Sequence, residues 1–315
     1  MSLPRVDLSR DGHEVAAAVG AACRSHGFFY LTGHGLSDDL LADLEAQSHA
    51  FFNRSEAEKL DIAMPKAGPA WRGFFPVGGE LTSGRPDLKE GIYFGEELGP
   101  ADPRVRAEWP MHGANLWPQR PVGLRPAVEA YMAGATRAAH ALTRAVAASL
   151  GLGPGYFDRY TAQPTVLFRI FHYPPQTGIE NGYGVGEHTD YGFLTLLAQD
   201  RHGGLQVKVD GEWLDAPPVQ GALVCNVGDM LDRLTRGAYR SVPHRVINTS
   251  GQERLSFPLF FDPGFDAVIE PLPLEAAPRS PRWDEADLDA VTGRYGDYLL
   301  GKVGKVFPGL KAQVL

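Results

Sequence analysis

The sequence has few cysteines, no long apolar run and no cluster of basic residues. Its 315 residues include only Cys23 and Cys225, too few for a disulfide scaffold and too far apart for a zinc motif. A run of about 18 apolar residues is nowhere present, and the N-terminus lacks the apolar segment of a secretion signal. The 30 Lys and Arg residues are outnumbered by 38 Asp and Glu residues, so nucleic-acid binding would lack its electrostatic basis. These absences predict a cytoplasmic protein that binds neither membrane nor nucleic acid.

What the chain does have is a 43% hydrophobic composition, enough to bury a large core. Apolar residues recur at helical spacing before Gly27, and Ser55 begins a capping box for another helix. A long amphipathic helix is predicted from near Pro126 to Gly151. Between these helices, residues 67–122 are rich in Gly and Pro and show no sustained period. Loops of such length often carry function.

The pattern changes to β-structure in the second half of the chain. Over residues 165–263, β-branched and aromatic segments alternate with turn signals, as in a sandwich or barrel. The clearest hairpin covers residues 205–214, where Asp210 and Gly211 suit the two positive-φ positions of a type I′ turn. A final helix is predicted within residues 284–303. Helices, then strands, then a helix favour one integrated α+β unit.

His188 and Asp190 are the first candidate metal ligands. In an extended chain, residues two apart point to the same face, so both side chains can reach one ion. His244, 54 residues after Asp190, is the candidate third ligand. Two imidazoles and one carboxylate leave open positions, which suits a non-haem Fe(II) that must also bind dioxygen and a cosubstrate. Because the tripeptide H-x-D is common, separately packed or exposed histidines are the alternative interpretation.

Arg254 and Ser256 make the metal interpretation stronger. They share one face of a predicted strand, ten residues and more beyond His244. A guanidinium group and a hydroxyl group that point inward together form a receptor for a carboxylate. No Asp or Glu on the same face of that strand compensates the arginine, and a buried unpaired charge is costly. A dicarboxylate cosubstrate would supply the missing negative charge.

These residues, together with four segments of the chain, follow one another in the order found in a known family. The sequence resembles the iron(II)/2-oxoglutarate-dependent dioxygenases of the isopenicillin N synthase-like family. The resemblance covers nearly the whole chain, and the segments that carry it are residues 27–35, 84–90, 188–195 and 226–229. It implies a distorted double-stranded β-helix, or jelly roll, flanked by N-terminal and C-terminal helices. It also implies an N-terminal region at 1–122, and a second region at 123–315 whose jelly-roll core spans about 165–265.

The resemblance further implies Fe(II), 2-oxoglutarate and dioxygen as the cofactor and cosubstrates. The enzyme would oxidise a C–H bond of a small molecule, by hydroxylation, with release of succinate and CO₂. Tyr173 would hydrogen-bond the cosubstrate, whereas Phe171 departs from the asparagine that the family often has there. Arg169 shares the face of Tyr173, so it either contacts the cosubstrate or forms a salt bridge at the barrel rim. No catalytic residue beyond the metal ligands is expected.

Candidate substrate residues come from the Gly- and Pro-rich stretch and from the barrel. Glu80 and Phe75 offer a charge and an aromatic surface, with a loop ion pair as the alternative role of Glu80. Tyr191, next to Asp190, and Phe261, beyond the Arg254 strand, are further candidates, although Phe261 also suits the core.

Other titratable residues are expected to have structural roles. Asp229 follows Gly228 in a turn, where Asp commonly bonds its own backbone. His172 is predicted to be packed or at the surface. Two other functions remain open: an iron oxidase of the same fold that does not use 2-oxoglutarate, and a ligand-binding barrel without catalysis. The sequence does not indicate an oligomeric state.

Overall fold

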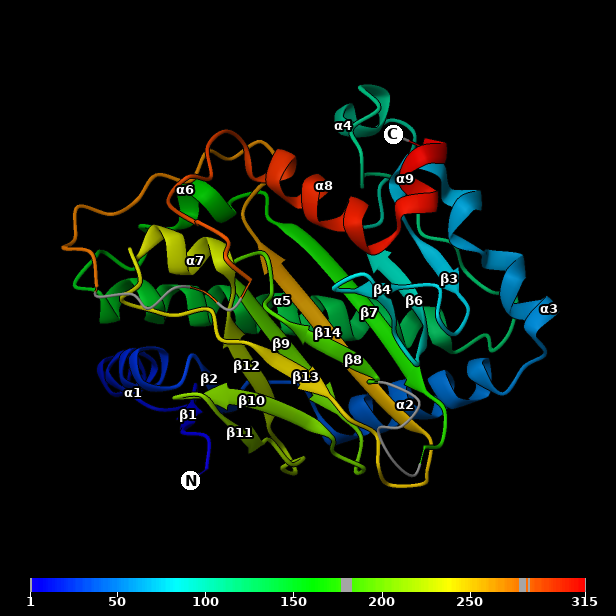
Figure 1. The fold of residues 1–315 in the computed structure, drawn as a ribbon, viewed down its shortest axis with the longest axis horizontal. Helices are drawn as coiled ribbons and strands as arrows, with labels where there is room; N and C mark the ends of the chain where they lie inside the picture. The colour runs from blue at the N-terminus through cyan, green and yellow to red at the C-terminus, as the bar shows by residue number, and fades with distance from the viewer. Residues whose placement is uncertain (1, 177–182, 278–281, 283, 315) are drawn as a thin grey trace.

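Two β-sheets form the centre of the molecule, and helices pack around them (Figure 1). The computed structural model describes residues 2–176, 183–277, 282 and 284–314. The larger sheet has eight strands in the order β1 (Arg5–Asp7), β2 (Phe28–Thr32), β12 (Leu223–Val227), β9 (Leu194–Gln199), β14 (Arg254–Asp262), β7 (Thr165–Tyr173), β6 (Glu90–Gly95) and β3 (Gly73–Phe75). The smaller sheet has the order β11 (Glu212–Asp215), β10 (Leu205–Val209), β13 (His244–Val246) and β8 (Val185–His188). A short hairpin joins β4 (Leu81–Thr82) to β5 (Arg85–Pro86).

The pairing of the strands places the candidate site residues near one another. All neighbouring strands are antiparallel except β1 and β2, which are parallel. In the larger sheet, β14 lies between β9 and β7, and Arg254 pairs with Tyr173. In the smaller sheet, His244 of β13 pairs directly with His188 of β8. Each sheet therefore contributes one part of the predicted site.

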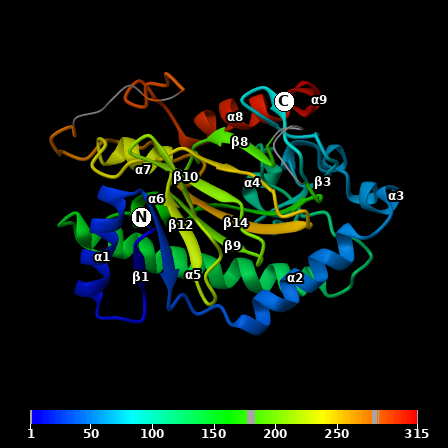
Figure 2. The same ribbon diagram turned by 60° about the horizontal axis from the view of Figure 1, so that its bottom comes forward.

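Helices cover the outside of the larger sheet. Figure 2 shows the long helix α5 running beneath the strands, with α1 and α2 beside it. The hydroxyl of Tyr131, on the buried face of α5, donates a hydrogen bond of 2.9 Å to the carbonyl of Phe257 in β14. The helices are α1 (Gly12–Ser25), α2 (Asp38–Phe52), α3 (Glu56–Lys59), α4 (Pro103–Arg106), α5 (Leu124–Ser149), α6 (Asp158–Thr161), α7 (Asp229–Leu234), α8 (Tyr295–Val306) and α9 (Pro308–Val314). Two 3₁₀ helices cover Leu60–Ile62 and Met64–Ala70.

Several local signals in the sequence are confirmed. Ser55 forms the expected capping box with Glu58 at the start of α3. The hairpin between β10 and β11 turns at Asp210 and Gly211, whose φ angles of 50° and 89° match a type I′ turn. Gly151 lies just beyond the end of α5, and its φ angle of +72° ends the helix as the sequence predicts. These features depend on neighbouring residues alone, which is why the sequence predicts them.

Residues 67–122, whose sequence shows no sustained period, contain regular strands of the larger sheet. This segment contains β3 and β6, and β6 pairs with β7 in the larger sheet. All six residues of β6 are buried, so its sequence shows no alternation of polar and apolar side chains. A short strand that is covered on both faces and bounded by glycine gives no periodic signal.

The last long helix begins later than predicted. Residues 284–294 contain no helix in the part of the chain that the structure describes, and α8 starts at Tyr295. Gly293 has a φ of +86°, and Arg294 is extended, so the backbone cannot continue a right-handed helix there. Leu288 and Val291 match the helical period by sequence but pack against the protein from a loop.

The two cysteines are free thiols buried in the core. Burial raises the pKa of Cys23 to about 12, so this thiol stays protonated. No helix among the described residues is long and apolar enough to cross a membrane. The cytoplasmic location stays a prediction.

Candidate metal centre and cavity

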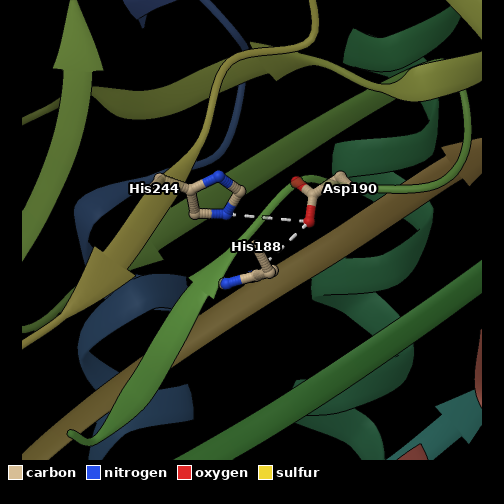
Figure 3. A group of neighbouring side chains, drawn as sticks. All are labelled: His188, Asp190 and His244. Atoms are coloured by element: carbon tan, nitrogen blue, oxygen red, sulfur yellow. Dashed lines mark ion pairs between the residues drawn. The ribbon is translucent and has the colours of Figure 1, made fainter. Parts of the chain in front are cut away.

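Three side chains meet between the two sheets (Figure 3). His188 is the last residue of β8, His244 is the first of β13, and Asp190 lies in the loop that follows β8. The Nε2 atoms of His188 and His244 lie 4.0 Å and 3.7 Å from Oδ1 of Asp190. The ligand atoms of all three residues lie within 4.8 Å of one another, close enough to bind a single metal ion.

Hydrogen bonds leave one free ligand atom on each side chain. Nδ1 of His188 lies 2.8 Å from the carbonyl of Gly186, and Nδ1 of His244 lies 3.3 Å from that of Val242. Because a carbonyl only accepts, each Nδ1 carries the proton and each Nε2 keeps its lone pair. The two histidines therefore present Nε2 to the space in front of Asp190.

Oδ2 of Asp190 is engaged by two buried side chains. It accepts hydrogen bonds from Oγ1 of Thr195 at 2.5 Å and from Nδ2 of Asn226 at 2.6 Å. These bonds leave Oδ1 directed toward the two histidines and fix the orientation of the carboxylate. Sequence reasoning assigned no role to either partner, although Asn226 begins one of the segments that carry the family resemblance.

Electrostatics favours the protonation states that bind a metal. Burial works to raise the pKa of Asp190, but His244, His188 and the hydrogen bonds from Asn226 and Thr195 outweigh it, so the pKa lies below its usual value. Burial and the neighbouring His188 lower the pKa of His244, against the opposing effect of Asp190. The site therefore holds a carboxylate beside a neutral imidazole at neutral pH, and both are metal-binding forms.

The triad opens into a cavity of about 600 Å³ between the sheets. Both sheets, the β4–β5 hairpin and α8 contribute to its wall, so the C-terminal part of the chain forms part of the cavity. This volume suits a cosubstrate and a small organic substrate side by side.

Arg254 is buried in the wall of this cavity with one nitrogen unsatisfied. Nε donates to the carbonyl of Gly203, and Nη2 donates to Oε1 of Gln199 at 3.3 Å. Nη1 has no hydrogen-bond partner among the described residues, and the side chain is fully buried. No described carboxylate forms an ion pair with it. A buried guanidinium with a free donor beside a metal site fits the distal carboxylate of 2-oxoglutarate.

Ser256 and Tyr173 lie next to Arg254 in the cavity wall. The guanidinium carbon of Arg254 is 4.7 Å from the centroid of the Tyr173 ring, and the hydroxyls of Tyr173 and Ser256 are 3.4 Å apart. Phe171 pairs with Ser256 across the strands and also lines the cavity, where the family often has asparagine. The structure therefore brings together Arg254, Ser256 and Tyr173, three of the four residues that were predicted to hold the cosubstrate.

Arg169 also lines the cavity, but it lies apart from Arg254. It precedes Tyr173 by four residues on β7, a separation of about 13 Å along a strand. Among the described residues no carboxylate forms an ion pair with it, so the expected salt bridge at the barrel rim is not found.

Of the expected substrate residues, Glu80 and Tyr191 line the cavity. Glu80 is in the ion pair that was its alternative role: Oε2 lies 3.0 Å from Nζ of Lys89, and Oε1 accepts a hydrogen bond of 2.7 Å from the hydroxyl of Tyr93. Sequence reasoning missed Lys89, which directly precedes β6, and Tyr93 within it, because nothing local shows that this segment faces the site.

Phe75 and Phe261 are not among the residues that line the cavity, which corrects their expected substrate role. The ring of Phe75 packs behind the wall, 5.5 Å from Tyr93 between ring centroids. Phe261 lies on the face of β14 that turns toward α5, 4.7 Å from His140. Phe260 lines the cavity instead. Alternation along β14 places Phe260, and not Phe261, on the same strand face as Arg254 and Ser256.

The expected local role of Asp229 was wrong. Asp229 begins α7, and its fully buried carboxylate accepts hydrogen bonds from Nη1 of Arg282 at 3.1 Å and from the hydroxyl of Tyr298 at 2.8 Å. Its backbone N–H donates to the carbonyl of Asp190 at 2.8 Å. Asp229 thus joins the C-terminal segment to the loop that carries a candidate metal ligand.

His172 is packed, as predicted, yet it also has charged partners. Its ring nitrogens lie 2.8 Å from Glu90 and 3.0 Å from Glu253, and its ring stacks on Phe52. It faces away from the cavity because it alternates with Phe171 and Tyr173 along β7.

Comparison with known proteins gives the family. Residues 3–120 match the family described as non-haem dioxygenase in morphine synthesis, N-terminal, and residues 164–263 match the 2OG-Fe(II) oxygenase superfamily. A probable iron/ascorbate oxidoreductase of Dictyostelium discoideum is 43% identical over 99% of this chain and 97% of its own length. A homoarginine-6-hydroxylase of Arabidopsis thaliana is 37% identical over 96% of this chain and 85% of its own length.

Solved structures agree with this assignment. A full-length protein of Neurospora crassa, solved in complex with alpha-KG, has a TM-score of 0.81 at 26% identity, with 96% of each chain covered. A jelly roll with helices outside it, which carries a His–Asp–His triad, defines a non-haem Fe(II) oxygenase. The chain belongs to the 2OG-Fe(II) oxygenase superfamily and is of the isopenicillin N synthase-like type. The predicted fold class, the enzyme class and the use of Fe(II), 2-oxoglutarate and dioxygen on a small molecule are confirmed.

Proposed function

We propose that this enzyme hydroxylates a C–H bond of a small-molecule substrate in the cavity between the two sheets. His188, Asp190 and His244 bind the iron, and Arg254 with Ser256 binds the distal carboxylate of 2-oxoglutarate. The observation that carries the proposal is the buried, unpartnered Nη1 of Arg254 beside the triad. When bound, iron supplies the activation of dioxygen that is coupled to conversion of 2-oxoglutarate to succinate and CO₂.

The protein's own residues supply binding, orientation and exclusion of water. The Nε2 atoms of the two histidines and Oδ1 of Asp190 would hold the metal, and three protein ligands would leave positions for the cosubstrate and dioxygen. Tyr173 and Ser256 offer hydroxyls beside the guanidinium, so the cosubstrate has one orientation. Side chains of α8 form part of the cavity wall.

A second candidate is an iron oxidase of the same fold that does not consume 2-oxoglutarate. It is favoured by the 33% identity to a 1-aminocyclopropane-1-carboxylate oxidase of Dictyostelium mucoroides, over 97% of this chain. The carboxylate receptor around Arg254 favours the hydroxylase. The amount of succinate formed per molecule of oxidised product decides between the two.

The test is a screen for succinate formation that depends on the substrate. Purified protein with Fe(II), 2-oxoglutarate and oxygen is incubated with a metabolite library that includes homoarginine and 1-aminocyclopropane-1-carboxylate. We expect a substrate to raise succinate formation above the uncoupled rate, with one succinate per product that has gained an oxygen atom. Oxidised product without matching succinate would refute the hydroxylase and support the oxidase.

Replacing Asn226 with alanine is expected to weaken metal binding about 10- to 100-fold, because the carboxylate of Asp190 loses a hydrogen bond that orients it. The measurement is titration of the apoprotein with Fe(II) under anaerobic conditions. Asn53→Ala serves as the control, since Asn53 follows the end of α2, far in sequence from the triad. Unchanged Fe(II) affinity in Asn226→Ala would show that Asp190 needs no such support.

A further inference from the structure

Arg169 is a second arginine buried in the cavity wall, and the roles described so far do not use it. It is 5% exposed and lies on the same face of β7 as Phe171 and Tyr173. Burying a charge without an acidic partner is costly, and this cost is the reason for assigning an anionic ligand to Arg254. Arg169 calls for an anionic ligand on the same grounds.

The guanidinium of Arg169 is held in place by neutral groups. Its Nη1 donates to the carbonyls of Phe94 at 3.2 Å and of Phe168 at 3.1 Å. Its central carbon lies 3.5 Å from the centroid of the Tyr93 ring. A guanidinium has five N–H groups, so at least two lack an acceptor among the described residues.

A comparison with Arg72 shows that Arg169 is not simply a structural arginine. Arg72 is also buried, but it does not line the cavity, and its nitrogens hold the loop that precedes α5. Its acceptors are the carbonyls of Glu96, Met111 and Gly113 and the side chain of Asn115. Four acceptors thus hold Arg72 in a structural role away from the cavity, although its buried Nε has no partner among the described residues. Arg169 differs because its remaining donors lie at the cavity.

Two carboxylates act on Arg169 without forming an ion pair with it: Glu80 is paired with another cation, and Asp262 accepts a hydrogen bond from the hydroxyl of Tyr295. Burial raises the pKa of Asp262 to about 7, so its negative charge is reduced at neutral pH. Glu80 lies 3.0 Å from Lys89, and Lys89 also lies 2.5 Å from Asp87. These three side chains carry one net negative charge, and Glu80 makes no ion pair with Arg169, because its Oε1 accepts a hydrogen bond from the hydroxyl of Tyr93. Burial lowers the pKa of Arg169, against the smaller opposing effects of Tyr93, Glu80 and Asp262. The guanidinium charge is therefore only partly compensated.

Arg169 is too far from Arg254 to serve the same ligand. The two residues are separated by about 13 Å along the strands. Their guanidinium groups pack against different rings, that of Arg169 against Tyr93 and Phe260 and that of Arg254 against Tyr173. The five-carbon 2-oxoglutarate, with one end at Arg254 and the other at the iron, does not extend along the wall to Arg169. An anion bound at Arg169 would therefore be a second ligand, separate from 2-oxoglutarate, in the remaining part of the cavity.

We propose that Arg169 binds a carboxylate of the substrate, so that the substrates of this enzyme are small carboxylic acids. The inference rests on the proposed function, because it places the substrate in the same cavity. The guanidinium is fixed between Tyr93 and Phe260, so it is oriented before the ligand arrives. A carboxylate at Arg169 would leave the remainder of the molecule to extend toward the triad.

The test compares each free acid with its primary amide, which has the same shape but no charge. The thermal midpoint Tm of the protein with Fe(II) and 2-oxoglutarate is measured without oxygen, so that binding is detected without turnover. The probes are homoarginine, 1-aminocyclopropane-1-carboxylate and straight-chain monocarboxylic acids, each beside its amide. We expect acids to raise Tm and amides to need at least about 30-fold higher concentration for the same rise.

Variants then assign the effect to Arg169. Arg169→Gln is expected to lose the preference for acid over amide, and Arg169→Lys to keep part of it. Both are expected to retain the rise in Tm caused by 2-oxoglutarate, which shows that the fold and the Arg254 site are intact.

Three results would overturn the proposal: amides that bind as tightly as acids, undiminished acid binding by Arg169→Gln, or no acid that raises Tm of the wild type. Failure of the proposed function is a different observation, the absence of substrate-dependent succinate.

Discussion

Asp190→Ala is expected to reduce substrate-dependent succinate formation to the background level of metal-free protein. The variant removes the one carboxylate among three ligand groups that lie within 4.8 Å of one another. Two neutral imidazoles alone neither neutralise Fe(II) nor complete the three-point face that holds it. The measurement is bound iron per protein after anaerobic loading and desalting, followed by the succinate assay.

His202→Ala provides a matched control for the loss of a metal-binding side chain. His202 contacts Arg201 in a turn and lies outside the triad. It is expected to retain full iron content and turnover. If Asp190→Ala still bound one iron per chain with undiminished affinity, the assignment of the triad as the metal centre would be wrong. His188→Ala and His244→Ala should match Asp190→Ala in both measurements.

Arg254→Gln is expected to weaken 2-oxoglutarate binding by at least about 30-fold. Truncating one partner of a buried, hydrogen-bonded charge pair costs about 2–5 kcal/mol, and each 1.4 kcal/mol is a factor of ten in affinity. Without cosubstrate, the same change removes a buried, unpaired charge. We therefore expect the variant without ligand to unfold at a Tm no lower than that of the wild type.

The measurement is the Kd for 2-oxoglutarate from titration calorimetry of the anaerobic Fe(II) protein. Arg137→Gln is the matched control, because Arg137 is exposed on α5, outside the cavity. Iron content should be unchanged in Arg254→Gln, which separates loss of the cosubstrate from loss of the metal. An unchanged Kd would refute the role of Arg254 and with it the observation on which the proposed function rests.

Much of the site could be predicted because its residues lie close together in the sequence. Arg254 and Ser256 share a strand face by the period of two, and the structure places both in the cavity wall. His188 and Asp190 do point to one place, but only His188 belongs to a strand, and Asp190 reaches it from the loop. The third histidine depended on the family spacing, since nothing local relates His244 to residues more than fifty positions earlier.

The errors share one physical cause. β6 is buried on both faces, so its sequence shows no amphipathic period. Phe75 and Phe261 are aromatic residues near the site in sequence, but the orientation of their strands turns them into the core. Asp229 has partners more than fifty residues away in the C-terminal segment, which a turn-forming rule for Asp cannot anticipate.

By itself, the sequence determined the helix caps, the hairpin turn, the ligand types and their family, because each depends on neighbouring residues or on a motif. Only the tertiary structure decided which faces of the strands and helices pack against one another. It gave Arg254 a buried nitrogen without a partner, placed Arg169 about 13 Å along the same wall, and made α8 part of the cavity wall. These features depend on packing between segments that are distant in sequence, and no local sequence pattern determines the free energy of that packing.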